Sequence, residues 1–468
     1  MRRLTAAPEP DQAPDELTAR AFEALDRRLL GNDPAPVAIG VSGGGDSMAL
    51  LQIASDWAAR RGRRLVAFSV DHRLQPEAAA WSRFAIEAAR ACGAGGEILA
   101  WEGEKPVAGL PAAAREARHR LLARAARRAG ARVLLLAHTA DDAAESELMR
   151  ARGSSLGRLR EWGPSPAWPE GRDLFLLRPL LHARRDALRT LLRRRGLDWI
   201  EDPANDDPAY ARSRARTELA DQLAEGAGRV LAPDPAAQAA MQALAAATTA
   251  TGGGFVIDRN ALRTAPRDIA AAYVAAALLS AAGTRRPPRG ARLAGLLDRL
   301  RSETPVSATL AGARIEAGPA FVEVARDAGE VSRGGLAPLV LQPETVSVWD
   351  GRFEITVDEP GWRVVPAAGR MSGLEPQDRK AVLALGQIHR GSQPVLERTG
   401  GEGAGTRPVL ASRRARVRAL AASRLAAACG LIAHEAGIIQ ALMAPEGSGP
   451  YVGDLGGPAE AVGIQRPV

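Results

Sequence analysis

Cysteine and histidine are scarce in this chain, and their scarcity argues against several kinds of site. The 468 residues include 2 Cys and 6 His. Cys92 and Cys429 lie far apart in the sequence, which excludes a disulfide framework and a CxxC metal or redox site. No HExxH pair is present, so we expect no zinc site.

Long apolar runs are also missing. The first residues, MRRLT, lack the apolar core of a secretion signal, and the longest apolar stretch, 269–282, is too short to span a bilayer. We therefore expect a cytoplasmic protein with no membrane partner. Lys and Arg number 62 against 54 Asp and Glu, a mild basic surplus that fits a nucleic-acid partner. The length predicts two to four domains.

The segment 42–47, SGGGDS, is the most informative part of the sequence. It follows a short apolar run at 37–41 and precedes a helical pattern that begins at Met48. A strand, a tight glycine turn and a helix N-terminus form a cradle for phosphate, because the amides point inward and the helix start carries partial positive charge. The alternative is an ordinary glycine turn in a chain with 48 Gly. That alternative does not account for the flanking Ser42, Asp46 and Ser47.

Two other phosphate-binding motifs are excluded. No GxxxxGK[ST] occurs, and Met48 stands where the dinucleotide motif GxGxxG needs its third glycine. The segment instead resembles the PP-loop, SGGxDS, of the ATP pyrophosphatases, which split ATP into AMP and pyrophosphate. We expect ATP and Mg²⁺ as cofactors, with Asp46 as the metal ligand. The residues of the loop assigned to ATP are Ser42, Gly43, Gly44, Gly45, Asp46 and Ser47.

The first half of the chain alternates apolar runs with helical patterns, which predicts an α/β fold with a doubly wound parallel sheet. The predicted strands are 37–41, 65–70, 97–101, 133–137 and 174–177, and the predicted helices are 48–61, 76–92, 111–128 and 141–150. Ligands of such sheets bind beyond the carboxyl ends of the strands. Polar residues stand at three of these ends: the segment 42–47, Asp71 with His72, and a segment that begins at His138. One composite site is therefore expected.

The segment 138–146, HTADDAAES, contributes clustered carboxylates. Asp142 and Glu145 are three residues apart and share a helix face, and Asp141 is four residues from Glu145. Carboxylates beside a triphosphate need a cation, which could be magnesium or an amine substrate. The alternative, a negatively charged first helical turn, would suffice for Asp141 alone.

Seven segments in order resemble the tRNA(Ile)-lysidine synthetase family. They are SGGGDS at 42–47, VDHRLQ at 70–75, AREARH at 114–119, HTADDAAES at 138–146, RGSSLG at 152–157, RPLL at 178–181 and DPANDDPAYARSRAR at 202–216. Together they cover roughly residues 35–216. The chain departs from the family pattern at Gln75, His119, Ser146 and Ser155.

The resemblance implies that ATP adenylates C2 of the wobble cytidine of tRNA(Ile) with a CAU anticodon, and that L-lysine then replaces AMP. It implies lysine recognition by Asp142 and Glu145, one of which takes the proton. Arg118 could neutralise the phosphates or the adenylated intermediate, although a solvated helix arginine is an equal alternative without the resemblance. Asp71, His72 and His138 are assigned to the nucleotide site. The tRNA contacts are assigned to Arg152, Arg178, Asn205, Arg212 and Arg216.

The expected domains are a catalytic domain at 1–218, a helical middle domain at 219–330 that positions tRNA, and a smaller mixed C-terminal domain at 331–468. In the second half we expect helices at 236–250, 269–282 and 291–301 and a hairpin of 309–315 with 321–324. The basic stretch 413–424 is interpreted as an acceptor-stem contact or as a solvated face. Arg184, Arg185 and the arginines at 193–195 are interpreted as a solvated helix face, with a contribution to the tRNA phosphate contacts as the alternative. Some members of the resembled family are homodimers.

The nearest rival is another PP-loop enzyme that modifies tRNA or forms an amide. Thiolating enzymes need cysteine pairs, and glutamine-dependent amidotransferases need a nucleophile at position 2, which is Arg2 here. NAD and GMP synthetases would share SGGxDS but not the segments at 152–157, 178–181 and 202–216. A non-catalytic RNA-binding protein would not need Asp46, Asp142 and Glu145.

Overall fold

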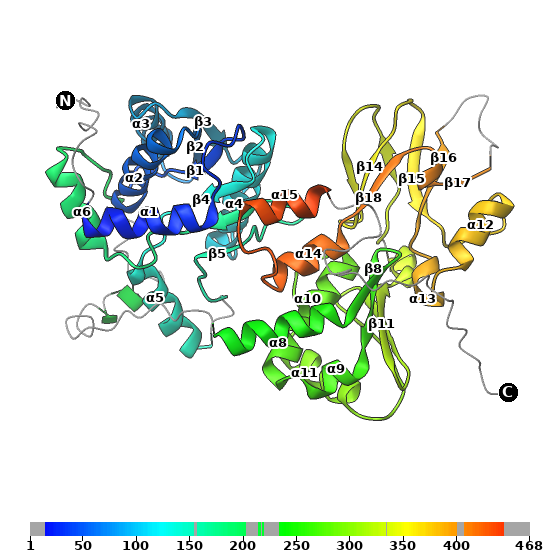
Figure 1. The fold of residues 1–468 in the computed structure, drawn as a ribbon. Coiled ribbons are helices and arrows are strands. Elements are labelled where there is room, and N and C mark those ends of the chain that lie inside the picture. The colour runs from blue at the N-terminus through cyan, green and yellow to red at the C-terminus, as the bar shows by residue number, and fades with distance from the viewer. Residues whose placement is uncertain are drawn as a thin grey trace.

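The computed structural model describes residues 15–153, 157–202, 214–216, 218–219, 234–333, 335–399 and 407–443. Its N-terminal unit contains a six-stranded sheet in the order β3-β2-β1-β4-β6-β5 (Figure 1). The strands are β1 (Val37–Gly40), β2 (Leu65–Asp71), β3 (Gly95–Ala100), β4 (Val133–Leu135), β5 (Trp162–Pro164) and β6 (Phe175–Leu177). All pairs are parallel except β5 with β6. The predicted doubly wound sheet is confirmed, and the strand order reverses direction between β1 and β4.

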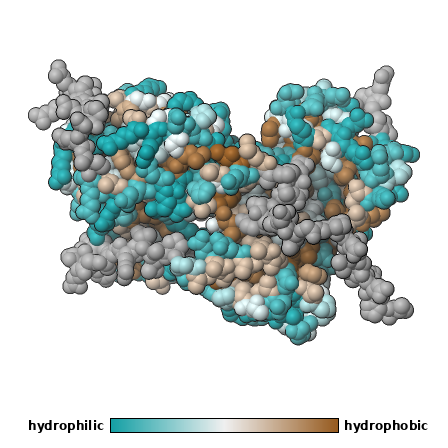
Figure 2. Space-filling model, in the orientation of Figure 1, coloured by the Kyte–Doolittle hydropathy of each residue, from teal (hydrophilic) through white to brown (hydrophobic). Residues whose placement is uncertain are grey.

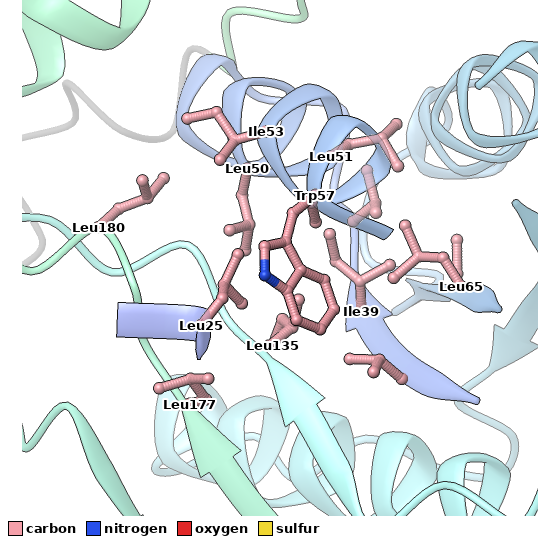
Figure 3. Packing of buried hydrophobic residues seen from close by; sticks show 14 of the residues in the cluster. Leu25, Ile39, Leu50, Leu51, Ile53, Trp57, Leu65, Leu135, Leu177 and Leu180 are labelled. Carbon is pink, nitrogen blue, oxygen red and sulfur yellow. The ribbon is translucent and has the colours of Figure 1, made fainter. Parts of the chain in front are cut away.

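Helices cover this sheet: α1 (Glu16–Arg28), α2 (Gly45–Arg61), α3 (Ala78–Ala91), α4 (Leu110–Arg128), α5 (Ala140–Ala151) and α6 (Arg185–Arg194). Trp57 of α2 lies among Leu25, Ile39, Leu50 and Leu135, and is almost fully buried (Figure 3). Because α2 is enclosed by the sheet, α1 and α6, every residue from 47 to 54 is buried. The sequence interpretation placed the start of α2 three residues late and did not predict α1 or β5.

The middle region combines helices with a five-stranded antiparallel sheet in the order β7-β8-β11-β10-β9. Its elements are α8 (Pro235–Ala246), β7 (Thr248–Thr251), β8 (Gly254–Asp258), α9 (Arg259–Thr264), α10 (Arg267–Ala282), α11 (Gly290–Arg301), β9 (Val306–Leu310), β10 (Ala313–Ala317) and β11 (Phe321–Arg326). The prediction of one helix over 236–250 is therefore wrong at its end. Three of the four residues of β7 are β-branched threonines, and the strand turns back onto β8 through Gly252 and Gly253, at φ of 52° and 78°. The region predicted as a hairpin of two strands forms three strands, β9, β10 and β11. The extra strand arises because Ala311 and Gly312 form a turn inside 309–315.

Two small sheets, β12-β15-β16-β17 and β13-β14-β18, form the C-terminal part. Its elements are η3 (Ala328–Arg333), β12 (Leu339–Leu341), β13 (Ser347–Trp349), β14 (Phe353–Thr356), β15 (Trp362–Pro366), α12 (Pro376–Leu383), α13 (Gln387–Arg390), β16 (Pro394–Arg398), β17 (Val409–Leu410), η5 (Ala411–Arg413), β18 (Arg416–Ala419), α14 (Ala421–Ala428) and α15 (Glu435–Met443). Four arginines of the basic stretch make intramolecular contacts. Arg413 pairs with Asp378, and Arg416 pairs with Asp358. Arg418 pairs with Asp173 and Glu354, and Arg424 donates to the carbonyl of Leu279 at 2.6 Å.

The last two helices return to the earlier units. Leu425 of α14 joins the core of the middle region, and Ile438 of α15 joins the core of the N-terminal sheet. Figure 2 shows hydrophobic residues gathered along α15, with hydrophilic residues over much of the N-terminal unit in this view. Because both helices cross the expected boundaries, the division at 218 and 330 stays a prediction. Among the described residues, no helix combines the length and apolarity needed to cross a membrane.

A buried ionic cluster fixes α15 to the N-terminal unit. The Glu435 carboxylate accepts two hydrogen bonds from Arg63, at 3.0 and 3.1 Å, one from Arg132 at 3.2 Å and one from the Leu30 amide at 3.0 Å. The side chains of Arg63 and Glu435 are 0% and 1% exposed. These contacts tie residues more than 300 positions apart in the sequence.

Candidate active site

The glycine turn after β1 forms a braced loop at the start of α2. Gly43 has φ of 87°, in the left-handed region, and its carbonyl accepts the amide of Ile200 at 2.9 Å. Ser47 Oγ donates to the carbonyl of Gly44 at 2.9 Å and accepts the amide of Ser42 at 3.2 Å. The two serines therefore hold the shape of the loop. The helix N-cap, Gly44, supplies no side-chain cap, which leaves the first amides of α2 for an anion.

One arginine joins the glycine turn to the carboxylates after β4. Arg185, the first residue of α6, contacts Asp46 through Nε at 3.4 Å and Glu145 through Nη1 at 2.6 Å, and it also pairs with Asp142. Its backbone amide donates to Asp141 Oδ2 at 2.9 Å. The interpretation of Arg185 as part of a solvated helix face is wrong, because its side chain is only 15% exposed and its charge is compensated inside the site.

The carboxylates of α5 are held from the helix N-terminus as well. Asp142 and Thr139 form a capping box, in which the Thr139 amide donates to Asp142 Oδ2 at 2.8 Å. Glu145 Oε1 accepts a second guanidinium contact, from Arg216 Nε at 3.3 Å. The Asp142 and Glu145 side chains are 7% and 2% exposed. Arg185 joins these carboxylates to Asp46 of the glycine turn, and their assignment to lysine stays a prediction.

The charges of this cluster are strongly coupled. Burial raises the pKa of Asp46 to about 6, and the neighbouring Arg185 opposes that rise. Burial alone would lower the pKa of Arg185, but the Glu145, Asp142 and Asp46 carboxylates raise it above its usual value. Arg185 is therefore the resident cation of three carboxylates, and the cluster tolerates little loss of positive charge.

The residues fit a magnesium ion that is held mainly by phosphates. The described residues contain no group of three or more His, Cys, Asp or Glu side chains that could hold a metal. Asp46 is the accessible carboxylate, with 27% of its side chain exposed and a long contact of 3.4 Å to Arg185. Mg²⁺ commonly binds one or two protein carboxylates together with substrate phosphates and water. Asp46 can therefore supply one ligand beside a nucleotide at the start of α2.

A second group of residues at the sheet edge is cationic or neutral. Arg178, which follows β6, donates from Nε to His138 Nδ1 at 3.1 Å. Burial, followed by Arg115, Arg118 and Arg178, lowers the pKa of His119 to about 3. Because these arginines crowd one edge of the sheet, the edge attracts anions.

The end of β2 completes this edge. Burial and then Arg118 lower the pKa of His72, which keeps its imidazole neutral. Asp71 Oδ1 accepts the amide of Arg73 at 2.8 Å and shapes the turn after β2. Asp71 and His72 lie at the end of β2, His138 follows β4, and Arg118 lies on α4; their assignment to the nucleotide stays a prediction.

The residues assigned to tRNA have diverse surroundings. Arg152 is half exposed and pairs with Glu218, whereas Arg178 is buried and donates from Nη1 to the carbonyl of Arg160 at 2.8 Å. Arg216 lies against Glu145. Asn205 and Arg212 lie outside the described residues. All five assignments stay predictions.

Sequence reasoning missed two contributors besides Arg185. Ile200 pairs with the glycine turn, and Trp199 packs against Gly45, where a Cβ would lie 3.4 Å from Trp199 Cδ1. Their positions follow from tertiary packing, and the only signal was the aromatic-aliphatic pair between two polar segments. Arg185 begins the helix that follows β6, but it stands in a run of arginines that does not single it out.

Comparisons with known proteins identify the family. Residues 16–223 match the family model for a PP-loop domain. The chain is 48% identical over 417 residues to the tRNA(Ile)-lysidine synthase of Caulobacter vibrioides, covering 88% of this chain and 97% of that protein. It is 38% identical over 331 residues to the enzyme of the same name from Hyphomonas neptunium, covering 68% and 88%.

Among solved structures, the U34-tRNA thiolase NcsA from Methanococcus maripaludis, described with its [4Fe-4S] cluster, is similar over 46% of this chain and 73% of that chain. It has a TM-score of 0.38 and 19% sequence identity, and this likeness carries no argument about function. The two sequence relatives cover 88% and 68% of this chain and 97% and 88% of their own lengths. The chain belongs to the tRNA(Ile)-lysidine synthase family.

Proposed function

We propose that this protein uses ATP and Mg²⁺ to join L-lysine to C2 of the wobble cytidine of tRNA(Ile) with a CAU anticodon. It would be a ligase that forms a carbon–nitrogen bond, and we expect it to act in the cytoplasm. The observation that carries the proposal is the cluster of Asp46, Asp142, Glu145 and Arg185, which places cation-binding carboxylates directly beside the glycine turn.

The first step would activate the cytidine. The C2 carbonyl oxygen attacks the α-phosphorus of ATP, an O–P bond forms, and the bond to pyrophosphate breaks. The amides at the start of α2 would hold phosphate oxygens, and Asp46 would bind the Mg²⁺ that neutralises the departing pyrophosphate. Arg118 lies on the cationic edge and would face the phosphate of the adenylated cytidine.

The second step would replace AMP with lysine. The lysine ε-amine attacks C2, a C–N bond forms, and the C2–O bond to AMP breaks. The amine must lose a proton to attack, and Asp142 or Glu145 would accept it. Because both carboxylates contact Arg185, the lysine ammonium must share or displace this guanidinium. Asp142 and Glu145 already hold the cationic end of one long side chain, that of Arg185, and would hold the lysine ammonium in the same way.

The two thiols do not favour the thiolation alternative. Burial raises the pKa of Cys92, and burial raises the pKa of Cys429 to about 12. A sulfur carrier needs an accessible thiolate, and both thiols are held in the protonated form at neutral pH. This contrast supports an amine as the second substrate.

The test is a transfer assay with three labelled nucleophiles. The protein is incubated with MgATP, tRNA(Ile) transcript bearing a CAU anticodon, and labelled lysine, cysteine or ammonia. We expect label to enter the tRNA from lysine alone, with one AMP released per lysine joined. Label from cysteine or ammonia, with none from lysine, would overturn the proposal.

Sedimentation would measure the mass in solution and so test the expected homodimer. Two variants would test the site. Asp46→Ala should abolish AMP release, whereas Asp142→Asn should raise the lysine KM more than the ATP KM. An unchanged lysine KM in Asp142→Asn would remove Asp142 from the lysine site.

A further inference from the structure

Arg178 is fixed by the backbone of the sheet at the end of β6. The parallel pairing of β4 with β6 sets Leu135 beside Leu177, and the Leu136 amide donates to the carbonyl of Leu177 at 3.0 Å. On the other side, the Arg178 amide donates to the carbonyl of Glu161 at 2.8 Å. Arg178 is therefore the first residue after β6, a strand that pairs on both sides. His138 lies just beyond β4, the strand beside it.

The side chain of Arg178 points along this edge and is occupied. The residue is 8% exposed, its Nη1 donates to the carbonyl of Arg160 at 2.8 Å, and its Nε donates to His138 Nδ1 at 3.1 Å. A side chain buried in this way has little surface to offer to a tRNA phosphate. Its contacts suit a role inside the protein instead.

The contact with Arg178 determines which protons His138 carries. A guanidinium can only donate hydrogen bonds, so Nδ1 of His138 must accept. An imidazole that accepts at Nδ1 carries its one proton on Nε2, and the doubly protonated imidazolium would set two donors against each other. Arg115 acts on Arg178 and, together with Arg118, on His119, so this edge of the sheet is positively charged.

We propose that Arg178 is a positioning residue that holds His138 as the neutral tautomer with its proton on Nε2. His138 then serves the reaction as a hydrogen-bond donor to a substrate oxygen, either the cytidine carbonyl or the phosphate of the adenylate. It does not take the proton of the incoming amine, which goes to the carboxylates of α5. This proposal rests on the proposed function for the identity of the substrate, but not for the tautomer.

The first experiment reads the tautomer in the absence of any substrate. The protein is labelled with ¹⁵N-histidine, and long-range ¹H–¹⁵N spectra at pH 7 separate the Nε2–H tautomer, the Nδ1–H tautomer and the imidazolium. The His138 signal is assigned as the one lost in His138→Gln. We expect the Nε2–H pattern in the wild type, and either of the other two forms would overturn the proposal, whether or not the enzyme forms lysidine.

The second experiment uses Arg178→Met, which keeps much of the side-chain volume but has no donor. We expect the His138 signal to move toward a mixture of tautomers and kcat to fall roughly tenfold or more, while the KM for tRNA changes less than twofold. Arg178→Lys, which retains one donor group, should restore part of the Nε2–H pattern of His138 and part of kcat. A raised KM for tRNA with unchanged kcat and an unchanged His138 spectrum would make Arg178 a tRNA contact and overturn the proposal.

Two His138 variants give a matched comparison. His138→Gln places an amide N–H near the position of Nε2, whereas His138→Ala leaves no donor. If His138 acts as a donor, the Gln variant should keep at least severalfold more activity than the Ala variant. Equal loss in the two variants would contradict the donor role. If Arg178→Met fails to fold, the wild-type spectrum still decides the tautomer.

Discussion

Replacing Arg185 with methionine should destabilise the N-terminal unit more than most single substitutions. The change removes a guanidinium that contacts Asp46, Asp142 and Glu145 together, while methionine fills much of the same volume. Asp142 and Glu145 are almost completely buried, so water does not take over the lost contacts. Breaking a buried ion pair by removing one partner typically costs about 3–5 kcal/mol.

That cost is large against a total free energy of unfolding of about 5–15 kcal/mol for a typical protein. For a unit of about 200 residues, a loss of 1 kcal/mol lowers Tm by about 2–4 °C, so we expect a fall of roughly 10 °C in Arg185→Met. The measurement is scanning calorimetry of the full chain without ligands.

Its neighbour provides a matched control. Arg184 pairs with Asp141 at 3.1 Å, but its side chain is 43% exposed, and exposed pairs contribute about 0–1 kcal/mol. Arg184→Met should therefore leave Tm nearly unchanged. The double variant Arg185→Met with Glu145→Gln should recover part of the loss, because the second change removes one uncompensated charge. Equal Tm values for Arg184→Met and Arg185→Met would refute the reasoning.

Three further predictions concern other parts of the molecule. Gly43→Ala should weaken ATP binding at least severalfold in a calorimetric titration. The reason is that Gly43 has φ of +87° and the new Cβ would lie 2.6 Å from Ile200 Cδ1. Gly45→Ala, at ordinary φ, should weaken ATP binding less. His119→Tyr should flatten the acid side of the stability profile. The pKa of His119 is about 3 in the folded state and 6.5 in the unfolded state, so below pH 6.5 the unfolded state binds the extra proton. The free energy of unfolding of the wild type therefore decreases by at most about 1.4 kcal/mol for each pH unit below 6.5. The measurement compares urea midpoints at pH 7.5 and pH 5 in the two proteins. Glu435→Gln should expose 431–443 to faster hydrogen exchange while the amides of β1 and β2 stay protected; unchanged exchange would show that the ion pairs do not hold α15.

The parallel sheet and the location of the site could be predicted because both depend on local pattern. Short apolar runs such as 37–41 and 133–137 form strands, and polar residues just beyond them gather at one edge of the sheet. The carboxylates at 142 and 145 could be placed in the site by helical spacing. These inferences need only neighbouring residues and the geometry of a strand and a helix.

Arg185 could not be recognised because its neighbours conceal it. It stands in a segment where arginine recurs at 184, 189 and 193–195, and a hydrophilic run of this kind usually faces water. Only the tertiary placement of α6 against α2 turns this one arginine inward. The strand β7 was missed for a different reason: alanine-rich sequence favours helix, and pairing with β8 overrides that propensity at Thr248.

The ion pairs of Glu435 have a consequence for how the protein is made. Ribosomes deliver residues in order, and Arg63 and Arg132 precede Glu435 by 372 and 303 residues. At about 5–20 residues per second, Arg63 waits roughly 20–70 s for its buried partner. Until then Arg132 has Asp33 as a counter-charge, but Arg63 lacks its ion pair with Glu435. A messenger RNA broken before codon 435 would therefore yield a unit that contains the glycine turn and the carboxylates but lacks the contact that completes its packing, a form that cellular proteases would recognise by its lower stability.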